Sequence, residues 1–469
     1  MTRTFDRLGQ GRVSFVVGWA LLALAVAAAP SAMAATGQTP TVASPLRLAN
    51  TSPGDSVTPL TFDPAAYARA LTADTLVLRD FVLDAQRRVD LELHQVHILS
   101  ADARLVVGTA DGDVPMERPD MLLLSGTVSG RADSWVFLSL SPQGSNGYVE
   151  LGDETFIISS GPNGFGRATV IYNPATVPAG SINLHDLACG TDLLEQLNPI
   201  EPDGPNSPTQ GGPRGSTGCG VANIAVETDW EFTGSLFSGD TNLSAAYALS
   251  LMAAVSEIYN RDVGVQFNIS FLRVWSDSND PWTTNDAIQQ LYQFANYWNA
   301  NMPTVSRHVA HFLSGRSLAS AGGVAFLNGL CSPTVGYALS AHLNGFFPYP
   351  LLDNNWQNWD PFVVAHEMGH NFGTPHTHDL NPPIDGCAWG DCSVTPNGTI
   401  MSYCHTCPGG LSNILLQFHQ RIIDEEIVPY LEFQAPCDLL AYPPTISVQP
   451  VDNQKCVVDA FGFSVSADA

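Results

Sequence analysis

Three histidines and one glutamate within eleven residues constrain the fold of this chain more than any other feature of its sequence. His366 and His370 are four positions apart, so on a helix both imidazoles project from one face, about one turn apart. One zinc ion can accept a nitrogen from each of them. The pair Asp360-Pro361, followed by three apolar residues, predicts the start of this helix, with Asp360 as its N-cap.

The residues after the predicted helix supply a third histidine. Gly373 can adopt a left-handed conformation, and a turn there brings His376 back towards the other two imidazoles. Three protein ligands with one open position are typical of a catalytic zinc ion rather than a structural one. Glu367 is placed to take a proton from water that such an ion has made acidic. We therefore predict one catalytic zinc ion with Glu367 as the general base.

The stretch from His366 to His376 resembles the zinc-binding motif of the metzincins, and Thr399–Tyr403 resembles their Met turn. Within the metzincins, the residues from His370 to Gly373 are most similar to the reprolysin or adamalysin-like branch. The resemblance covers roughly Cys219–Cys437. It implies an α/β (α+β) catalytic domain with a twisted mixed sheet and a zinc-binding active-site helix. It also implies that Met401 forms an apolar floor beneath the zinc ligands.

A second stretch, from Gly322 to Cys331, resembles the substrate-side edge strand of the same branch. An exposed edge strand there would hold an extended peptide by strand addition. The resemblance further implies a disulfide between Cys331 and Cys437. The residues expected on the edge are Gly323, Val324, Ala325 and Phe326.

The sequence departs from the reprolysin pattern in two places. Thr377 and His378 intervene before Asp379, whereas the family usually has an aspartate directly after the third histidine. His378 competes as a ligand on that account, but His376 has the matching spacing. Near Asn223 the sequence has no match to the acidic residues of the calcium site that some relatives have, so calcium is not predicted.

The N-terminus has the pattern of a secretory signal peptide. Three arginines precede the apolar run Val13–Ala29, and small residues around Ala34 provide a cleavage site. The alternative is an uncleaved membrane anchor, but the run is short for a span and no later segment is apolar enough to cross a bilayer. We therefore expect residues 1–34 to be removed and the protein to be secreted, without membrane insertion.

The charge balance disfavours one class of partner. The chain has 45 acidic and 19 basic residues and a formal net charge of −26. Nucleic acids and anionic membranes need clustered Lys and Arg. We therefore predict no nucleic-acid partner. The family resemblance implies a protein or peptide substrate, and we expect a monomer.

Composition divides the rest of the chain into four parts. Residues 35–198 contain short apolar runs separated by glycine turns, which predicts a β-rich domain. Residues 199–218 have the composition of a flexible linker, and residues 219–440 form the predicted catalytic domain. Residues 441–469 resemble the start of an incomplete, Ig-like β-sandwich. The elements expected in the first part are a helix at Pro64–Leu71 and strands at Leu76–Leu83, Val89–Ile98, Met121–Val128, Trp135–Leu140 and Tyr148–Ile158.

Nine cysteines fit an oxidising compartment, and their odd number leaves at least one without a partner inside the chain. Under the family resemblance, four of them make two bridges around the Met turn, with a connectivity that the sequence leaves open. These four are Cys387, Cys392, Cys404 and Cys407.

Cys189 stands in a Cys-Gly pair just before the predicted linker. Reprolysin-like precursors carry a cysteine switch in a similar place, whose thiolate occupies the open zinc position. On that resemblance, residues 35 to about 215 form an inhibitory propeptide. The alternative is an ordinary disulfide, most simply between Cys189 and Cys219.

Together these features predict a secreted zinc metalloendopeptidase that hydrolyses internal peptide bonds by means of a zinc-activated water. One alternative is a catalytically silent binding or adhesion protein on a protease fold. Such a protein would have lost Glu367 or a zinc histidine, and neither is lost here. Another alternative is a zinc enzyme with a non-peptide substrate, which the edge-strand segment disfavours.

Overall fold

The computed structural model describes most of the chain. The described residues are 39–49, 56–162, 168–178, 180–185, 188–197, 220–352, 356–357, 359–435, 437 and 439. The predicted signal peptide, linker and C-terminal tail all fall outside these ranges, so the domain boundaries of the sequence analysis stay predictions.

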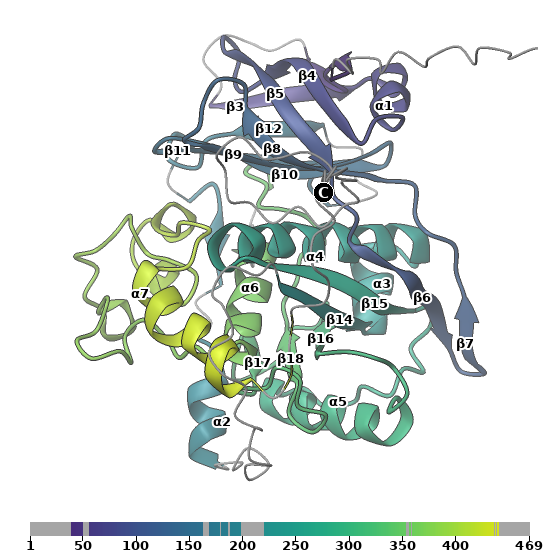
Figure 1. The fold of residues 1–469 in the computed structure, drawn as a ribbon, viewed down its shortest axis with the longest axis vertical. Coiled ribbons are helices and arrows are strands. Elements are labelled where there is room, and N and C mark those ends of the chain that lie inside the picture. The colour runs from purple at the N-terminus through teal and green to yellow at the C-terminus, as the bar shows by residue number, and fades with distance from the viewer. Residues whose placement is uncertain are drawn as a thin grey trace, which may run out of the picture. The chain divides into compact units, whose positions relative to one another are not determined.

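A ten-stranded sheet dominates the N-terminal region, residues 39–197 (Figure 1). Helix α1 (Pro64–Ala70) begins where the Asp63 carboxylate accepts hydrogen bonds from the backbone N–H groups of Ala65 and Ala66. The expected run Tyr148–Ile158 proves to be two strands, because a turn at Gly152 and Asp153 divides it. The strands, in sheet order, are β1 (Thr41–Ala43), β4 (Thr75–Val82), β5 (Arg88–Gln95), β8 (Leu122–Val128), β9 (Ser134–Ser141), β10 (Gly144–Leu151), β11 (Glu154–Ser159), β12 (Thr169–Tyr172), β3 (Val57–Phe62) and β2 (Leu46–Leu48).

A seven-stranded mixed sheet forms the framework of the second half of the chain, residues 220–439. Its order is β17 (Gly323–Ala325), β18 (Tyr337–Ser340), β16 (Val309–Leu313), β14 (Gly220–Thr228), β15 (Val265–Trp275), β6 (Leu99–Thr109) and β7 (Gly112–Pro115). Strands β18, β16, β14, β15 and β6 run parallel, and β17 and β7 are antiparallel to their neighbours. The predicted fold class, a mixed α/β domain preceded by a β-rich region, is confirmed.

Helices cover both faces of this sheet (Figure 1). Ile224 of β14 belongs to the same core cluster as Leu251 of α4 (Thr241–Val263), whereas its neighbour Ala225 packs with Leu291 of α5 (Ala287–Asn301). This alternation is the period of two that a strand imposes. Helix α6 (Asp360–Asn371) lies on the α4 side, where the Tyr259 hydroxyl donates to the Ala365 carbonyl at 3.0 Å. Smaller elements are α2 (Thr191–Leu197), α3 (Trp230–Leu236), α7 (Gln420–Ile422) and the strand pair β13 (Asn183–Leu184) with β19 (Trp356–Gln357).

Strands β6 and β7 belong by sequence to the N-terminal region but by pairing to the second sheet. Strand β6 adds parallel to β15, with Leu105 opposite Leu272 and Gly108 opposite Trp275. The expected strand Val89–Ile98 is therefore shorter than predicted, since the chain leaves the first sheet at Gln95. One buried cluster contains residues of both regions, among them Trp135 and Tyr148. The two regions thus share a core.

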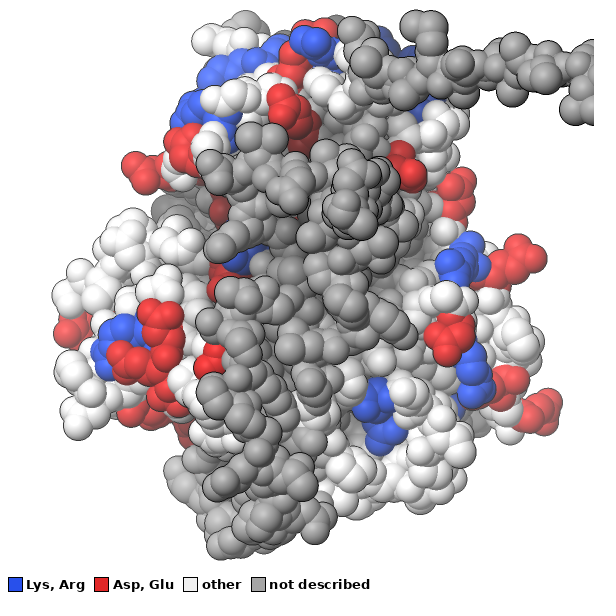
Figure 2. Space-filling view, in the orientation of Figure 1, with Lys and Arg blue, Asp and Glu red and all other residues white. Residues whose placement is uncertain are grey.

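The described surface carries charges of both signs. In the view of Figure 2, acidic and basic side chains are interspersed among uncharged ones. Among the residues that the structure describes, no helix combines the length and the apolar character that a membrane crossing requires.

Candidate metal centre

Helix α6 places two of the predicted ligands in a fully buried environment. The Nδ1 atom of His366 is 2.7 Å from the carbonyl oxygen of Ile400, and Nδ1 of His370 is 2.8 Å from that of Thr374. An N–H at each Nδ1 donates to its carbonyl, which leaves the lone pair on Nε2. Burial lowers the pKa of His370 to about 3, so this imidazole is neutral, as metal binding requires.

The start of α6 differs from the expectation. Trp359 occupies the N-cap position, and Asp360 is the first helical residue. The Asp360 carboxylate is buried and accepts hydrogen bonds from the Tyr247 hydroxyl at 2.6 Å and from the backbone N–H groups of Asn344 and Gly345 at 3.1 Å. It therefore anchors α6 to α4 and to a neighbouring loop instead of capping its own helix.

A turn at Gly373 returns the chain to the histidines. Its φ of 92° is in the left-handed region, and a side chain there would run into the ring of Tyr430. The His376 ring then lies 4.7 Å from the His370 ring and 5.1 Å from the His366 ring, centroid to centroid. Sequence reasoning placed the turn correctly because few other residues adopt this conformation.

Cys189 completes a cluster with the three histidines. One potential ligand atom from each of the four residues lies within 4.8 Å of every other, and all four residues are buried. The Cys189 Sγ is 3.4 Å from His370 Nε2 and 3.3 Å from an oxygen of Glu367. Cys189 is a free cysteine, so the structure does not show the alternative disulfide.

The donor set fits a zinc ion. The Nε2 atom of His366 is buried and has no hydrogen-bond partner, a costly state unless something accepts its lone pair. One sulfur and three imidazole nitrogens are ligands that zinc binds in tetrahedral sites. Burial raises the pKa of the Cys189 thiol to about 12, so a thiolate at this position requires a nearby cation. The residues therefore fit the metal that the sequence predicts.

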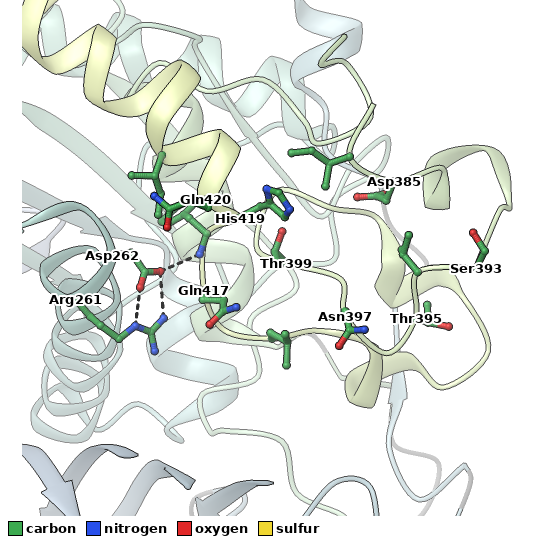
Figure 3. A pocket seen from close by; sticks show the side chains of 15 residues that line it. Arg261, Asp262, Asp385, Ser393, Thr395, Asn397, Thr399, Gln417, His419 and Gln420 are labelled. Atoms are coloured by element: carbon green, nitrogen blue, oxygen red, sulfur yellow. Dashed lines mark hydrogen bonds and ion pairs between the residues drawn. The ribbon is translucent and has the colours of Figure 1, made fainter. Parts of the chain in front are cut away.

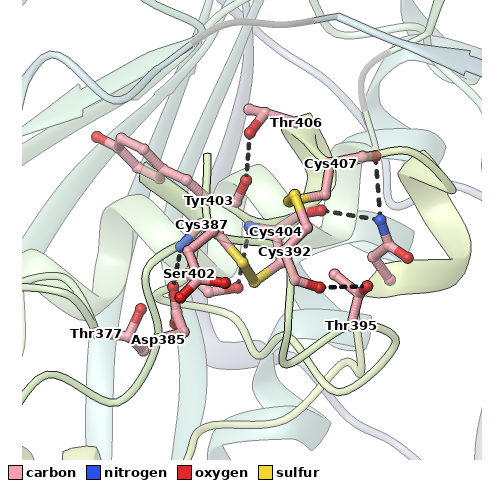
Figure 4. Close-up of a disulfide and its surroundings, with 12 residues drawn as sticks. Thr377, Asp385, Cys387, Cys392, Thr395, Ser402, Tyr403, Cys404, Thr406 and Cys407 are labelled. Atoms are coloured by element: carbon pink, nitrogen blue, oxygen red, sulfur yellow. Dashed lines mark hydrogen bonds between the residues drawn. A yellow bond between two sulfur atoms is a disulfide. The ribbon is translucent and has the colours of Figure 1, made fainter. Parts of the chain in front are cut away.

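The segment with Met401 lies directly beneath α6. Met401 is fully buried, and a side-chain carbon on Gly369 would stand 2.6 Å from its sulfur, so the glycine makes room for it. The Met401 carbonyl accepts a hydrogen bond from the Thr377 N–H at 3.0 Å, which ties the turn to the third histidine's segment. Disulfides join Cys387 to Cys404 and Cys392 to Cys407 around this turn (Figure 4). Cys331 is joined to Cys437, the pair that the resemblance implies.

The expected substrate edge is occupied by the chain itself. Cys189 forms a parallel bridge with Gly323, and the Gly190 N–H donates to the Gly323 carbonyl at 2.8 Å. The Thr191 hydroxyl donates to the Ala325 carbonyl at 3.1 Å. Strand β17 is shorter than the predicted strand and ends at Ala325; Phe326 follows it and is buried.

Two residues at the site were not identified from the sequence. An oxygen of Asp192 is 2.9 Å from Nδ1 of His376, and Asp379 contacts the same nitrogen at 3.4 Å. The Tyr403 hydroxyl accepts a hydrogen bond from the Cys189 N–H at 3.2 Å and lies 3.3 Å from Nε2 of His376. The only indications in the sequence were that Asp192 lies three residues after Cys189 and that Tyr403 lies in the Met-turn segment.

His378, the competing ligand, lies outside the four-residue cluster. Its ring stacks on that of His376 at a centroid distance of 5.1 Å, and Trp389 packs edge-on against it. Its position is therefore that of a neighbour of the third histidine.

A cavity of about 750 Å³ lies elsewhere, between the end of α4 and the loops that flank the Met turn (Figure 3). Its wall includes Arg261 and Asp262, which pair with each other at 2.6 Å, and Phe418, whose N–H donates to Asp262. None of the four clustered residues lines it. The histidine cluster, not this cavity, is therefore the candidate site.

Residues 220–414 match the family model Reprolysin_5, described as Metallo-peptidase family M12. This segment belongs to the reprolysin type of metzincins. Among similar proteins, the disintegrin and metalloproteinase domain-containing proteins 1a and 1b of Mus musculus are each 27% identical over 128 residues. That is 27% of this chain, and 15% and 14% of theirs, so the chain matches only a small part of these relatives.

A rat relative and one solved structure extend the comparison. Disintegrin and metalloproteinase domain-containing protein 1 of Rattus norvegicus is 25% identical over 144 residues, 30% of this chain and 17% of its own length. Metalloproteinase-II from Bacteroides fragilis aligns with a TM-score of 0.40 and 10% identity, over 83% of this chain and 99% of its own.

Proposed function

We propose that this chain is the precursor of a secreted zinc-dependent endopeptidase that is kept latent by its own N-terminal region. The observation that carries the proposal is the cluster of Cys189 with His366, His370 and His376 in a segment of a metallopeptidase family. Three ligands come from the family motif and the fourth from a part of the chain that precedes it. The cluster therefore supports both the metal and the latency.

The three histidines would hold the ion, and Glu367 would perform the proton transfers. When bound, zinc supplies a positive charge that makes water acidic and polarises a peptide carbonyl. The Glu367 carboxylate takes the proton of the attacking water and then delivers it to the leaving nitrogen. Its oxygen lies 3.3 Å from the Cys189 sulfur, so the base is adjacent to the ligand that blocks the site.

The substrate is an extended peptide that pairs with the edge of β17. The segment Ala188–Thr191 already uses this edge through its backbone, since the Gly322 N–H donates to the Ala188 carbonyl at 3.2 Å and the Gly190 N–H donates to Gly323. A strand edge offers the same groups to any extended chain, which explains why a protein substrate suits it. Access requires that the Cys189 segment leave.

Secretion fits the chemistry of the cysteines. Three disulfides cross-link the described part of the second half. Such bonds persist in oxidising compartments. The signal-peptide pattern at residues 1–34 supports export. We propose that the protein works as a monomer, without a second copy of this chain.

The test is removal of the general base. Glu367→Ala should keep its zinc, measured by elemental analysis, and lose at least about 100-fold in the cleavage of a peptide library by the processed protein. Glu425→Ala, a change of the same kind at an exposed position of the predicted catalytic domain, serves as the control. A zinc chelator should abolish cleavage by the parent protein, and added zinc should restore it. Cleavage by Glu367→Ala at the parent's rate would refute the mechanism.

A further inference from the structure

Beyond the thiol at the metal site, the N-terminal region holds the second half of the chain at two other places. The first is the far edge of the seven-stranded sheet. There β6 pairs with six positions of β15, from Ile269 to Trp275, and the Ser276 N–H donates to the Gly108 carbonyl at 3.1 Å. The N-terminal region therefore covers the β15 edge, while the Cys189 segment covers the β17 edge.

A buried ion pair reinforces the contact at β15. The Arg273 guanidinium is buried and pairs with Glu227 of β14 at 2.6 Å and with Asp113 of β7 at 3.1 Å. The indole N–H groups of Trp275 and Trp298 donate to the same glutamate. Without β7, this guanidinium would lose one of its two carboxylates and part of its cover, which is unfavourable for a buried charge.

The second place is the face of α4 and the loop that follows β18. The Tyr148 hydroxyl donates to the Ala254 carbonyl at 3.0 Å, and the hydroxyls of Ser139 and Ser250 are 2.6 Å apart. The Tyr172 hydroxyl donates to the Pro348 carbonyl at 2.7 Å. These polar contacts surround apolar packing, because the side chains of β9, β10 and β12 belong to the same buried cluster as α4.

Such a contact has the character of a permanent interface. It combines apolar packing, several paired polar groups and strand addition at two edges. Cutting the linker removes only the entropic advantage of having both parts on one chain. The noncovalent contacts between the two parts remain.

From these contacts we infer that the N-terminal region is a tightly bound subunit rather than a removable leader. A single cut between residues 198 and 219 leaves a two-chain complex, in which the β6–β7 hairpin and the β9–β10 face hold the N-terminal chain in place. Because Cys189 lies on that chain, the complex remains latent, and activation needs a second cut within residues 39–197. The statement on latency rests on the proposed function; the statement on association does not.

The test uses the full chain with a recognition sequence for a site-specific protease inserted near residue 208. The Glu367→Ala background prevents self-cleavage. After the cut, native mass spectrometry and size-exclusion chromatography at about 1 µM should show one species that contains both chains. Under denaturing conditions the same sample should give two. Two separate species under native conditions would overturn the inference, whether or not the protein binds zinc.

Variants of the hairpin test which contacts hold the complex. Asp113→Asn removes the carboxylate that pairs with Arg273 and should speed dissociation of the cut complex about fivefold. Asp111→Asn makes the same change on the exposed turn of the hairpin and should leave the rate unchanged. Gly108→Ala places a carbon 2.7 Å from the Trp275 ring and should have a larger effect than Asp113→Asn. Equal rates for the two aspartate variants would refute the role of the hairpin.

The latency statement has its own readout. With Glu367 intact, the cut complex should not cleave peptides until the N-terminal chain is degraded by a second protease. Immediate activity of an assembled complex would overturn the latency statement while leaving association intact. Inactivity even after the N-terminal chain is gone would instead count against the proposed function.

Discussion

At the scale of single residues, the site depends on which atoms each histidine leaves free. The Nδ1 atoms of His366 and His370 face backbone carbonyls, and Nδ1 of His376 faces the carboxylates of Asp192 and Asp379. The Nε2 atom of His366 has no hydrogen-bond partner, that of His370 lies 3.4 Å from the Cys189 sulfur, and that of His376 lies 3.3 Å from the Tyr403 hydroxyl. Asp192 belongs to the N-terminal region, so its removal would leave the third histidine with Asp379 alone.

The residue that decides latency is Cys189. Replacement by serine removes the thiol that faces the histidines, and a hydroxyl is a much weaker zinc ligand than a thiolate. Without the zinc–sulfur bond the segment can leave the β17 edge, so the uncut Cys189→Ser precursor should cleave peptides that the uncut parent does not. Ala188→Ser introduces the same group one position earlier, at an exposed site, and should stay latent. An uncut Cys189→Ser precursor as inactive as the parent would show that the thiol is not the inhibitor.

The sequence predicted these residues to different degrees. The histidine spacing and Gly373 follow from helix and turn geometry alone, so their arrangement could be anticipated. The contact of Asp192 with His376 could not, because it joins residues 184 positions apart. For the same reason the N-cap was misplaced, since Asp360 is bound by Tyr247 of α4, which lies 113 positions earlier, and by the loop after β18.

At the scale of elements, the turn between α6 and the third histidine is the most constrained piece. Gly373→Ala adds backbone strain at φ 92° and a clash with Tyr430, for an extra overpacking cost of about 1–3 kcal/mol. Gly390 has φ 81° but nothing within 4 Å of an added carbon, so Gly390→Ala carries the backbone strain alone. Denaturant unfolding should show the larger loss for Gly373→Ala, accompanied by weaker zinc retention. Equal losses and equal zinc content would show that the turn does not position His376.

The sequence predicted strands correctly where turn residues bound an apolar run. It failed where pairing with a strand far along the chain determines which sheet a segment joins. The predicted helix Pro64–Leu71 matches α1 (Pro64–Ala70), and the predicted strand Leu76–Leu83 matches β4 (Thr75–Val82). Strand β6 was missed because its partner β15 lies far along the chain, so no local pattern distinguishes it from a strand of the first sheet. The predicted strand at Val324 was too long, since only three residues pair with β18.

At the scale of the whole molecule, one disulfide connects the end of the edge-strand segment with the end of the second half. Cys331 and Cys437 are 106 residues apart, so the bond restricts a large part of the unfolded chain. Replacing both with serine should lower the free energy of unfolding by about 2–5 kcal/mol, measured by denaturant unfolding of the oxidised protein. Changing both cysteines avoids a new free thiol. An unchanged midpoint would mean that the bond does not stabilise the fold.

The larger organisation was only partly visible in the sequence. Composition separated a β-rich N-terminal region from an α/β second half, and both are present. It could not show that Leu105 and Tyr148 of the first region enter the core of the second, because burial against a distant partner leaves no local pattern.

The central claim is that Cys189 and the three histidines hold one zinc ion in the uncut chain. Zinc-edge X-ray absorption on the purified precursor, combined with elemental analysis, tests it directly. We predict one zinc per chain, with one sulfur at about 2.3 Å and nitrogens at about 2.0 Å. A precursor that retains no zinc, or a zinc ion without sulfur among its ligands, would contradict the claim.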